Sequence, residues 1–444
     1  MTRDDRGDRR RLGAVVLAVL VSQVLLYPGV PGLTVALGAP AGIDAGMWFL
    51  VAEFAAFVAF AVVWGAASDA LGRRVPLVVA GAVGGACSYL ALAALPAVGA
   101  GFDAALVVRA VGGAFTIGAF SLGITTLMDL GGGHGRNMGA AGLAIGLGAA
   151  VGSVVGGVLA DLDPLYPVYA GAVVLFAAGA LAATIDDRRT GPRGGSGRES
   201  AGSDSEVVSG SSTETAPGSE VASGAGAGRS TVGFRDVLAR VRATPSLLVP
   251  FAFGFVDRLT AGFFSLVGVF YFQDPATFGL SATGAGATLA LFFLPFALLQ
   301  APFGALSDRI GRFVPVVVGS LAYGIVIAAV GFAPIYPLAA ALMVLVGVCG
   351  ALLAPATMAL VTDLVDPDAR GAAMGLFNVF GSLGFLTGFL VGGSATGAFG
   401  YRPAFLVVGG LEFLIALLLF PVVRALTART GTAGTPASTG SDRI

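Results

Sequence analysis

The sequence has no lysine, a single histidine and only two cysteines, and charged residues make up 11% of its 444 positions. Soluble domains carry charge on about a quarter of their residues, so this composition excludes an ordinary water-soluble protein. Cys87 and Cys349 both fall inside apolar segments, which argues against a disulfide framework or a metal site. The chain pairs no nucleophile with a base and has no phosphate-binding glycine loop. We therefore expect no enzyme, no cofactor and no nucleic-acid partner.

Apolar residues and glycine are present in excess, with 56% hydrophobic residues and 69 glycines. A helix that crosses the roughly 30 Å core of a bilayer needs about 20 apolar residues, and such segments follow one another along this chain. The first six lie near residues 13–38, 46–67, 75–95, 103–127, 138–160 and 167–185, and the second six near 246–272, 283–306, 314–333, 337–361, 372–398 and 402–424. We predict an all-α membrane protein with twelve transmembrane helices in two pseudo-symmetric six-helix bundles.

The two bundles are expected over residues 13–185 and 246–424, with tails at 1–12 and 425–444. Between them, most of the linker at 186–245 is rich in Gly, Ser and acidic residues and cannot bury enough apolar surface to fold. The linker ends in FRDVLARVRA, whose apolar residues have the spacing of an interfacial helix. Arginines gather before the first span and in alternate loops, so both termini are expected in the cytoplasm of a multi-pass cell-membrane protein.

Two features of the sequence occur twice. The segment GAASDALGRRVP begins at Gly65, and GALSDRIGRFVP begins at Gly304, 239 residues later and again between two apolar segments. Five glycines of the fifth span, Gly139, Gly148, Gly152, Gly156 and Gly157, recur in the eleventh span as Gly375, Gly384, Gly388, Gly392 and Gly393, always 236 residues later. The chain is therefore predicted to be an internal duplication.

The repeated segment, here called the loop motif, resembles the signature of the major facilitator superfamily between helices 2 and 3. The matching residues are Gly65, Asp69, Gly72 and Arg73 in the first copy and Gly304, Asp308, Gly311 and Arg312 in the second. The first copy has Ala70 where the family usually carries Arg, and the second copy keeps Arg309. The resemblance covers the chain apart from the linker and tails. It implies a secondary transporter that works by alternating access.

In that family the loop motif is a breakable lock between the two halves. The resemblance implies that Asp69 faces the eleventh helix and that Arg73 meets Asp129. By the repeat, Arg312 meets Asp363. Glycine allows a tight turn, and a carboxylate can accept hydrogen bonds from a helix N-terminus or from arginine. Such contacts favour the outward-open state and break when the inside opens; the alternative is that these are solvated loop charges.

Two further segments resemble family motifs. RAVGGAF carries Arg109 and Gly113 of a helix 4 motif, with Gly112 in place of the usual Gln. The glycines from Gly139 to Gly157 match the spacing of the antiporter motif of drug and proton exchangers, with Ser153 where that motif has a helix-kinking proline. The alternative is that these small residues only allow helices to approach closely.

Five ionisable residues lie deep inside predicted spans, where an uncompensated charge costs roughly 3 kcal/mol or more. They are Glu53, Arg109, Asp257, Arg258 and Glu412. Glu53 and Arg109 lie at similar depth and are predicted to pair. Arg258 points about 100° away from Asp257 and is expected to turn toward Glu412. Asp257 is then left to carry a coupling proton, unless Asp257 and Arg258 form a pair that holds helices together.

The polar residues expected to line a central cavity are few, namely Gln23, Tyr27, Thr116, Ser265 and Thr357, with aromatic neighbours among Phe263, Phe264, Phe292 and Phe293. Such a cavity suits a lipophilic solute. We therefore predict a small-molecule transporter, a monomer in the lipid bilayer that carries out proton-coupled efflux of amphipathic compounds. The alternatives are uptake or exchange of a sugar or of a small organic anion anchored by Arg109 and Arg258, and a membrane sensor without transport activity.

Overall fold

The computed structural model describes residues 3–129, 134–185, 244–366 and 370–432, and these residues form helices without any strand. The first half contains α1 (Arg3–Val24), α2 (Val30–Ala36), α3 (Ile43–Leu71), α4 (Val75–Ala94), α5 (Phe102–Asp129), α6 (His134–Leu162) and α7 (Tyr166–Ala182). The second half contains α9 (Leu248–Phe263), α10 (Val269–Gln273), α11 (Ala282–Ile310), α12 (Gly319–Val330), α13 (Tyr336–Asp363), α14 (Arg370–Phe399) and α15 (Tyr401–Thr432).

The number of membrane spans agrees with the prediction. Ten stretches of the described residues are long and apolar enough to cross a membrane. Two shorter apolar helices, Tyr166–Ala182 and Val314–Val330, occupy the places of the sixth and ninth predicted spans. The linker at 186–243 with its expected interfacial helix, the side chain of Asp129 and the surroundings of Gly139 lie outside what the structure describes.

Three of the spans are not continuous α-helices. The first runs through α1, a 3₁₀ turn at Tyr27–Gly29 and α2. The seventh runs through α9, a π-helical turn at Phe264–Gly268 and α10. The ninth starts with a π-helical turn at Val314–Val318 that leads into α12. Pro28 has no backbone N–H to donate, which explains why the first span loses its α-helical bonding at the 3₁₀ turn.

The first and last helices extend into the segments expected to be tails. Helix α1 begins at Arg3 and α15 continues to Thr432, whereas the predicted spans start at 13 and end at 424. The polar start of α1 is bonded to the chain just after α7, since Arg11 donates to the carbonyl of Thr184 at 3.1 Å. Arg11 also pairs with Asp8 at 3.5 Å, one turn away on the same helix. These side-chain contacts keep the charged turn helical.

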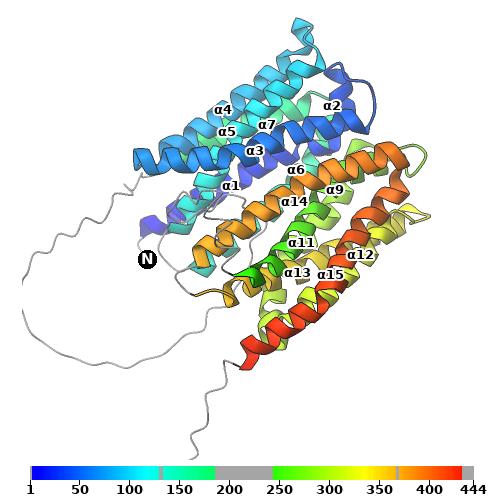
Figure 1. Ribbon diagram of the computed structural model, residues 1–444. Helices are drawn as coiled ribbons and strands as arrows, with labels where there is room; N and C mark the ends of the chain where they lie inside the picture. The colour runs from blue at the N-terminus through cyan, green and yellow to red at the C-terminus, as the bar shows by residue number, and fades with distance from the viewer. Residues whose placement is uncertain (1–2, 130–133, 186–243, 367–369, 433–444) are drawn as a thin grey trace, which may run out of the picture.

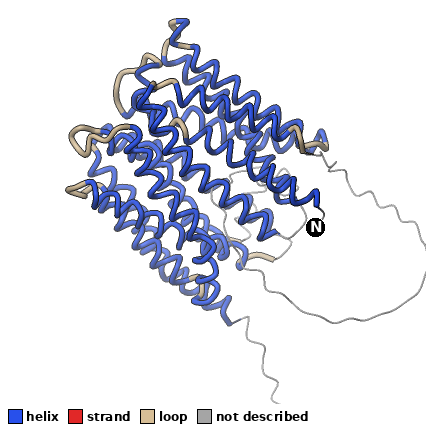
Figure 2. The backbone as a smooth tube through the Cα atoms, turned by 180° about the vertical axis from the view of Figure 1, so that it is seen from behind, coloured by secondary structure: helices blue, strands red, loops and turns tan. Residues whose placement is uncertain are grey.

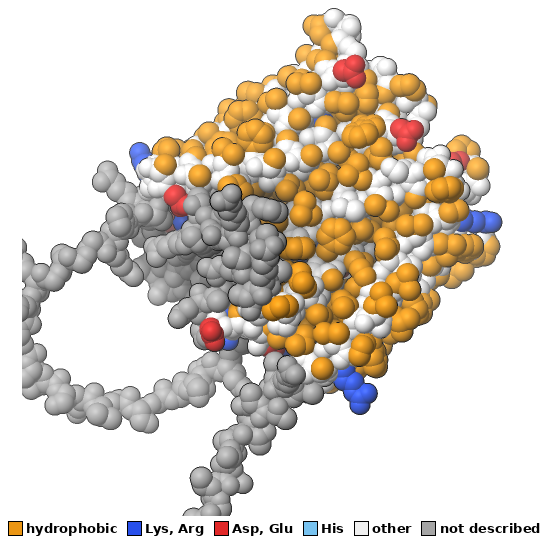
Figure 3. Space-filling view, viewed as in Figure 1, with side chains coloured by type: hydrophobic (Ala, Val, Ile, Leu, Met, Phe, Trp, Pro, Cys, Tyr) orange, Lys and Arg blue, Asp and Glu red, His pale blue; other side chains and the backbone are white. Residues whose placement is uncertain are grey.

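The helices form two bundles that lie side by side, α1–α7 in one and α9–α15 in the other (Figure 1, Figure 2). In the first bundle α5 packs against α3 and α4, and α1 packs against α6 and α7. In the second bundle α14 packs against α9, α13 against α11, and α15 against α12. The bundles meet where α6 packs against α11 and α3 against α14. Hydrophobic side chains cover the broad side of the molecule and charged ones lie toward its ends (Figure 3), as expected for a surface that contacts lipid.

The repeated glycines explain how closely the helices of each half approach. A Cβ atom on Gly156 of α6 would lie 2.1 Å from the carbonyl oxygen of Leu25, next to α1. One on Gly384 of α14 would lie 2.0 Å from the carbonyl oxygen of Phe255 on α9. Gly148 and Gly152 face the first helix in the same way and Gly388 faces α9, whereas Gly392 meets the side chains of Phe263 and Val267. Backbone therefore packs directly on backbone along both crossings.

The last glycine of each series faces the other half of the molecule instead. Gly157 meets the backbone of Ala282 and Thr283 at the start of α11. Its repeat, Gly393, meets the side chain of Met47 near the start of α3. The 236-residue repeat in the sequence is therefore also a repeat of contacts in space.

Replacing Gly384 by alanine should destabilise the second half, because the new methyl group would meet the backbone carbonyl of Phe255. Overpacking of this kind costs about 1–3 kcal/mol, which outweighs the roughly 1 kcal/mol that alanine gains over glycine in a helix. Purified Gly384→Ala protein should therefore show a lower melting temperature in detergent. Gly410→Ala on α15, where nothing lies within 4 Å of the new Cβ, is the control and should melt at or above wild type. An unchanged melting temperature for Gly384→Ala would contradict this account of the crossing.

Candidate functional site

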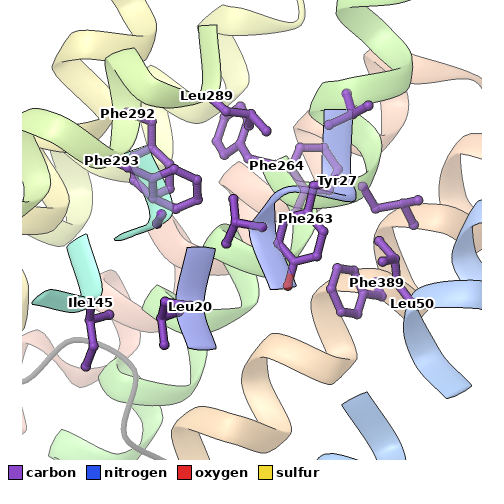
Figure 4. Packing of buried hydrophobic residues seen from close by; sticks show 14 of the residues in the cluster. Leu20, Tyr27, Leu50, Ile145, Phe263, Phe264, Leu289, Phe292, Phe293 and Phe389 are labelled. Carbon is purple, nitrogen blue, oxygen red and sulfur yellow. The ribbon is translucent and has the colours of Figure 1, made fainter. Parts of the chain in front are cut away.

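A cavity of about 90 Å³ lies between the two halves. Its walls come from α1, α3, α5 and α6 of the first half and from α9, α11 and α14 of the second. Figure 4 shows Phe292 and Phe293 of the second half near Leu20 and Ile145 of the first, all of which line the cavity. Seven phenylalanine rings contribute to the walls, those of Phe54, Phe57, Phe120, Phe292, Phe293, Phe296 and Phe385. Phenylalanine is therefore the commonest residue in the walls of the cavity.

Few polar side chains line this cavity. Gln23 and Tyr27, two of the five predicted polar residues, come from α1 and the 3₁₀ turn that follows it. Asp257 and Arg258 come from α9, and Ser382 comes from α14. The ionisable pair is therefore set among groups that offer few directional hydrogen bonds.

Thr116, Ser265 and Thr357 are not among the residues that line this cavity. Each hydroxyl donates to a carbonyl three or four residues earlier on its own helix, at 3.4, 2.8 and 2.9 Å respectively. Hydroxyl side chains inside helices commonly satisfy themselves in this way. Phe263 and Phe264 are likewise buried within the second half, where both rings contact Phe405.

Asp257 and Arg258 form an ion pair with each other. The Nε of Arg258 lies 3.6 Å from Oδ2 of Asp257, and both side chains are largely buried while lining the cavity. Neighbouring helix positions point about 100° apart, but the long arginine side chain reaches back to the carboxylate. The alternative that we left open for these two residues, a pair, is what the structure shows.

Glu412 is not paired with Arg258, contrary to the prediction. Its Oε1 accepts a hydrogen bond from the hydroxyl of Ser320, because at this level α15 faces α12. Its Oε2 has no hydrogen-bond partner, and the side chain is fully buried inside the second half. The intramembrane acid left without a base is therefore Glu412 rather than Asp257.

Glu53 and Arg109 form a buried ion pair, as their matching depth predicted. The pair lies inside the first half, between α3 and α5, where the guanidinium also stands over the rings of Phe49 and Tyr89 at 4.8 and 5.3 Å. Gly113, one turn along α5 from Arg109, allows the approach, because a Cβ there would lie 2.1 Å from the carbonyl oxygen of Glu53. Neither residue lines the cavity between the halves.

An aromatic contact between the halves escaped the sequence analysis. Phe54 of α3 stacks on Phe385 of α14, with ring centroids 4.7 Å apart, and it also contacts Phe57 and Phe389. The available signal was the helical spacing of phenylalanines, three residues apart in the second span and four apart in the eleventh. That spacing places two rings on one helix face but does not say which face meets the other half.

The second copy of the loop motif is a bonded cluster. Gly311 ends α11 with a φ of 84°, which suits glycine. The following Arg312 places Nη1 2.5 Å from Asp308 and 3.1 Å from Ser307, both on α11. Its Nε lies 3.2 Å from Asp363 at the end of α13. The structure thus brings Arg312 and Asp363 together, as the repeat implies.

The first copy of the loop motif has the same turn, since Gly72 follows α3 with a φ of 61°. Asp69 is exposed in the last turn of α3. Because the side chain of Asp129 lies outside the described part of the chain, its pairing with Arg73 stays a prediction.

Replacing Arg109 by methionine should strongly destabilise the first half, because it leaves Glu53 buried without a cation. Breaking a buried ion pair from one side costs about 3–5 kcal/mol. The double variant Glu53→Gln/Arg109→Met buries no charge and should recover most of the lost melting temperature. A double variant that melts as early as Arg109→Met would show that the pair is not the source of the effect.

Comparison with known proteins identifies the family. The model of the Major Facilitator Superfamily matches residues 12–277 and 259–439. The multidrug resistance protein MdtG of Salmonella paratyphi C is 33% identical over 172 residues, which are 37% of this chain and 42% of that protein. The multi-drug resistance efflux pump PmrA of Streptococcus pneumoniae is 32% identical over 176 residues, 40% of each chain. The chain thus spans about two fifths of the length of the curated relatives it matches.

Solved structures share the fold over nearly the whole chain. The human organic anion transporter MFSD10 has a TM-score of 0.66 at 21% identity, covering 94% of this chain and all of its own. The nucleoside transporter NupG has a TM-score of 0.70 at 13% identity, covering 94% of this chain and 98% of its own. A bacterial homologue of the human lysosomal transporter Spinster has a TM-score of 0.72 at 15% identity, covering 97% and 99%. With two six-helix bundles and a family match along most of its length, the chain belongs to the major facilitator superfamily, and its apolar helices make it a multi-pass membrane protein.

Proposed function

We propose that the protein exports small amphipathic compounds in exchange for protons, by alternating access. The observation that carries this proposal is the cavity between the halves, which is lined by seven phenylalanine rings and by the Asp257–Arg258 pair. The names of MdtG and PmrA, a multidrug resistance protein and a multi-drug efflux pump, support the same class of solute.

The lining favours amphipathic solutes over strongly polar ones. Phenylalanine rings bury apolar surface without fixing a solute in one orientation, whereas a sugar needs many placed donors and acceptors. A site with few directional hydrogen bonds discriminates weakly among solutes of similar size and polarity. Broad specificity is therefore expected, with the ionisable pair selecting for charge.

Asp257 is the proposed proton carrier. Its carboxylate lies 3.6 Å from the guanidinium of Arg258, a longer separation than the roughly 2.7–2.9 Å of a charge-assisted hydrogen bond. When the carboxyl group is protonated, the cavity loses its negative charge and Arg258 disfavours a cationic solute. When the proton leaves, the carboxylate attracts such a solute. Proton and solute then exclude each other at one site, which is the requirement for antiport.

The loop motifs are the proposed gate at one end of the molecule. Arg312 ties the end of α11 to the end of α13, which keeps that end of the second half together. Asp69 is proposed to bond the second half only when this end closes. We assign this end to the cytoplasm because arginine gathers there in the sequence. Both termini would then be cytoplasmic, in a monomer of the cell membrane.

Transport of a small organic anion is the second candidate, and Arg258 favours it. A guanidinium that lines a cavity can bind a carboxylate through two parallel hydrogen bonds. One protein of the same fold is named as an organic anion transporter. Against this candidate, Arg109 cannot serve as a second anchor because it is buried against Glu53, and Asp257 beside Arg258 would repel an anion.

Transport by the purified protein in proteoliposomes tests both candidates. A cationic amphipathic dye and an aromatic carboxylate of similar size are offered with and without an imposed pH gradient. We expect the dye to accumulate inside the vesicles only when the imposed pH gradient drives protons out of them. Accumulation of the carboxylate alone would favour the second candidate, and the absence of flux of either solute would contradict the proposal.

Asp257→Asn should abolish gradient-driven accumulation of the dye, because the amide cannot carry a proton. Exchange of an uncharged amphipathic compound across the membrane needs alternating access but neither net proton movement nor the charge of the carboxylate, so it should survive. Both fluxes are measured on the same vesicles. Ser382→Ala changes another residue of the cavity without changing its charge and should keep both fluxes. If Asp257→Asn loses both fluxes and its melting temperature falls, the pair with Arg258 is structural and the carrier assignment is wrong, since stranding a buried cation costs about 3–5 kcal/mol.

A further inference from the structure

We propose that Asp161 is a positioning residue that holds one end of the transport path closed. The inference rests on the proposed alternating access and names a contact that must open during each cycle. The contact, here called the latch, consists of the Asp161 carboxylate on α6 and the backbone N–H groups of Ala282 and Thr283 on α11. It joins the first half to the second.

The latch has the geometry of a helix cap supplied from the other half. Oδ1 of Asp161 accepts from the N–H of Ala282 at 2.8 Å, and Oδ2 accepts from the N–H of Thr283 at 2.9 Å. Ala282 is the first residue of α11, so these N–H groups have no acceptor within their own helix. A carboxylate at a helix N-terminus also interacts favourably with the helix dipole. Asp161 therefore satisfies two donors that would otherwise need water.

Glycines on both helices bring the latch within reach. Gly157 lies one turn before Asp161 on α6, and a Cβ there would lie 2.4 Å from the carbonyl oxygen of Ala282. Gly286 lies one turn after Ala282 on α11, and a Cβ there would lie 2.1 Å from the carbonyl oxygen of Ser153. The crossing of α6 and α11 is therefore backbone against backbone directly beside the hydrogen bonds.

Other contacts between the halves lie at the same end. The side-chain amide of Gln273, at the end of α10, donates to the carbonyl of Pro28 in the first half at 2.8 Å. The hydroxyl of Ser394 lies 3.7 Å from the sulfur of Met47. The two halves are thus in contact at this end of the molecule, and the latch contributes a charged group that makes two hydrogen bonds to backbone.

Asp161 and Asp69 stand in comparable places at opposite ends. Each lies in the last turn of a first-half helix, α6 for Asp161 and α3 for Asp69. Asp161 is bonded to the second half, whereas Asp69 is exposed. Asp161 is itself on the surface, so solvent can replace the backbone donors when the halves separate. We infer that the two carboxylates act in alternation, and that release of Asp161 accompanies opening of its own end.

The experiment measures the distance between the halves at this end. Spin labels are attached to cysteines placed at Ala41 and Ala276, exposed loop positions of the two halves, after Cys87 and Cys349 are replaced by serine. Asp161→Ala should increase the population with a long label–label distance about fivefold or more, because two charge-assisted hydrogen bonds that hold only the closed state are lost. Asp161→Asn, which keeps one acceptor oxygen, should give a smaller increase.

Asp163→Asn is the matched control. It removes an equal charge two residues away, but the Asp163 carboxylate accepts from the N–H of Leu165 in its own half at 2.7 Å. Its distance distribution should equal that of the wild type. Equal distributions for Asp161→Ala and wild type, in protein with an unchanged melting temperature, would overturn the proposal. Because the measurement needs no solute, a shifted distribution without any dye flux would count against the proposed function alone and leave the latch supported.

Discussion

Direct contact between helix backbones at glycine is the constraint on which the rest of this structure depends. In a bilayer, helices gain little from burying apolar side chains, since lipid is equally apolar, so close packing has to supply the attraction. The glycines of α6 and α14 supply it within each half, and Gly157 and Gly286 supply it between the halves. This close approach brings the polar groups of the two halves within hydrogen-bond distance at the closed end.

The fold could be predicted from the sequence because long apolar segments and repeated glycine spacings mark the helices directly along the chain. Every predicted span is occupied by helix in the described part of the chain, and the glycine offsets anticipated matching contacts in the two halves. The depth of a residue within the membrane could be predicted as well, since a helical rise of 1.5 Å per residue places Glu53 and Arg109 at the same level. That estimate was enough to pair them correctly.

The rotation of each helix about its axis could not be predicted from the sequence, and the differences between the predicted and observed contacts share this cause. Thr116, Ser265 and Thr357 have suitable depth for a cavity, but their hydroxyls bond to their own helices. Arg258 and Glu412 also share a level, yet Glu412 turns toward Ser320. Apolar residues surround most of these helices, so no polar face indicates which side meets the cavity, a neighbouring helix or lipid.

The breaks in the first and seventh spans carry a consequence for how the duplication is used. Both occur near the same level, but the first half tightens into a 3₁₀ turn at Tyr27–Gly29, whereas the second half widens into a π-turn at Phe264–Gly268. A tightened turn and a widened turn rotate the following side chains in opposite senses. Residues beyond the breaks therefore lose their rotational equivalence even where the sequences still align. The first and seventh spans, related by the duplication, therefore have different shapes. A role found for a residue in one of these spans cannot be assigned to the residue at the equivalent position of the other.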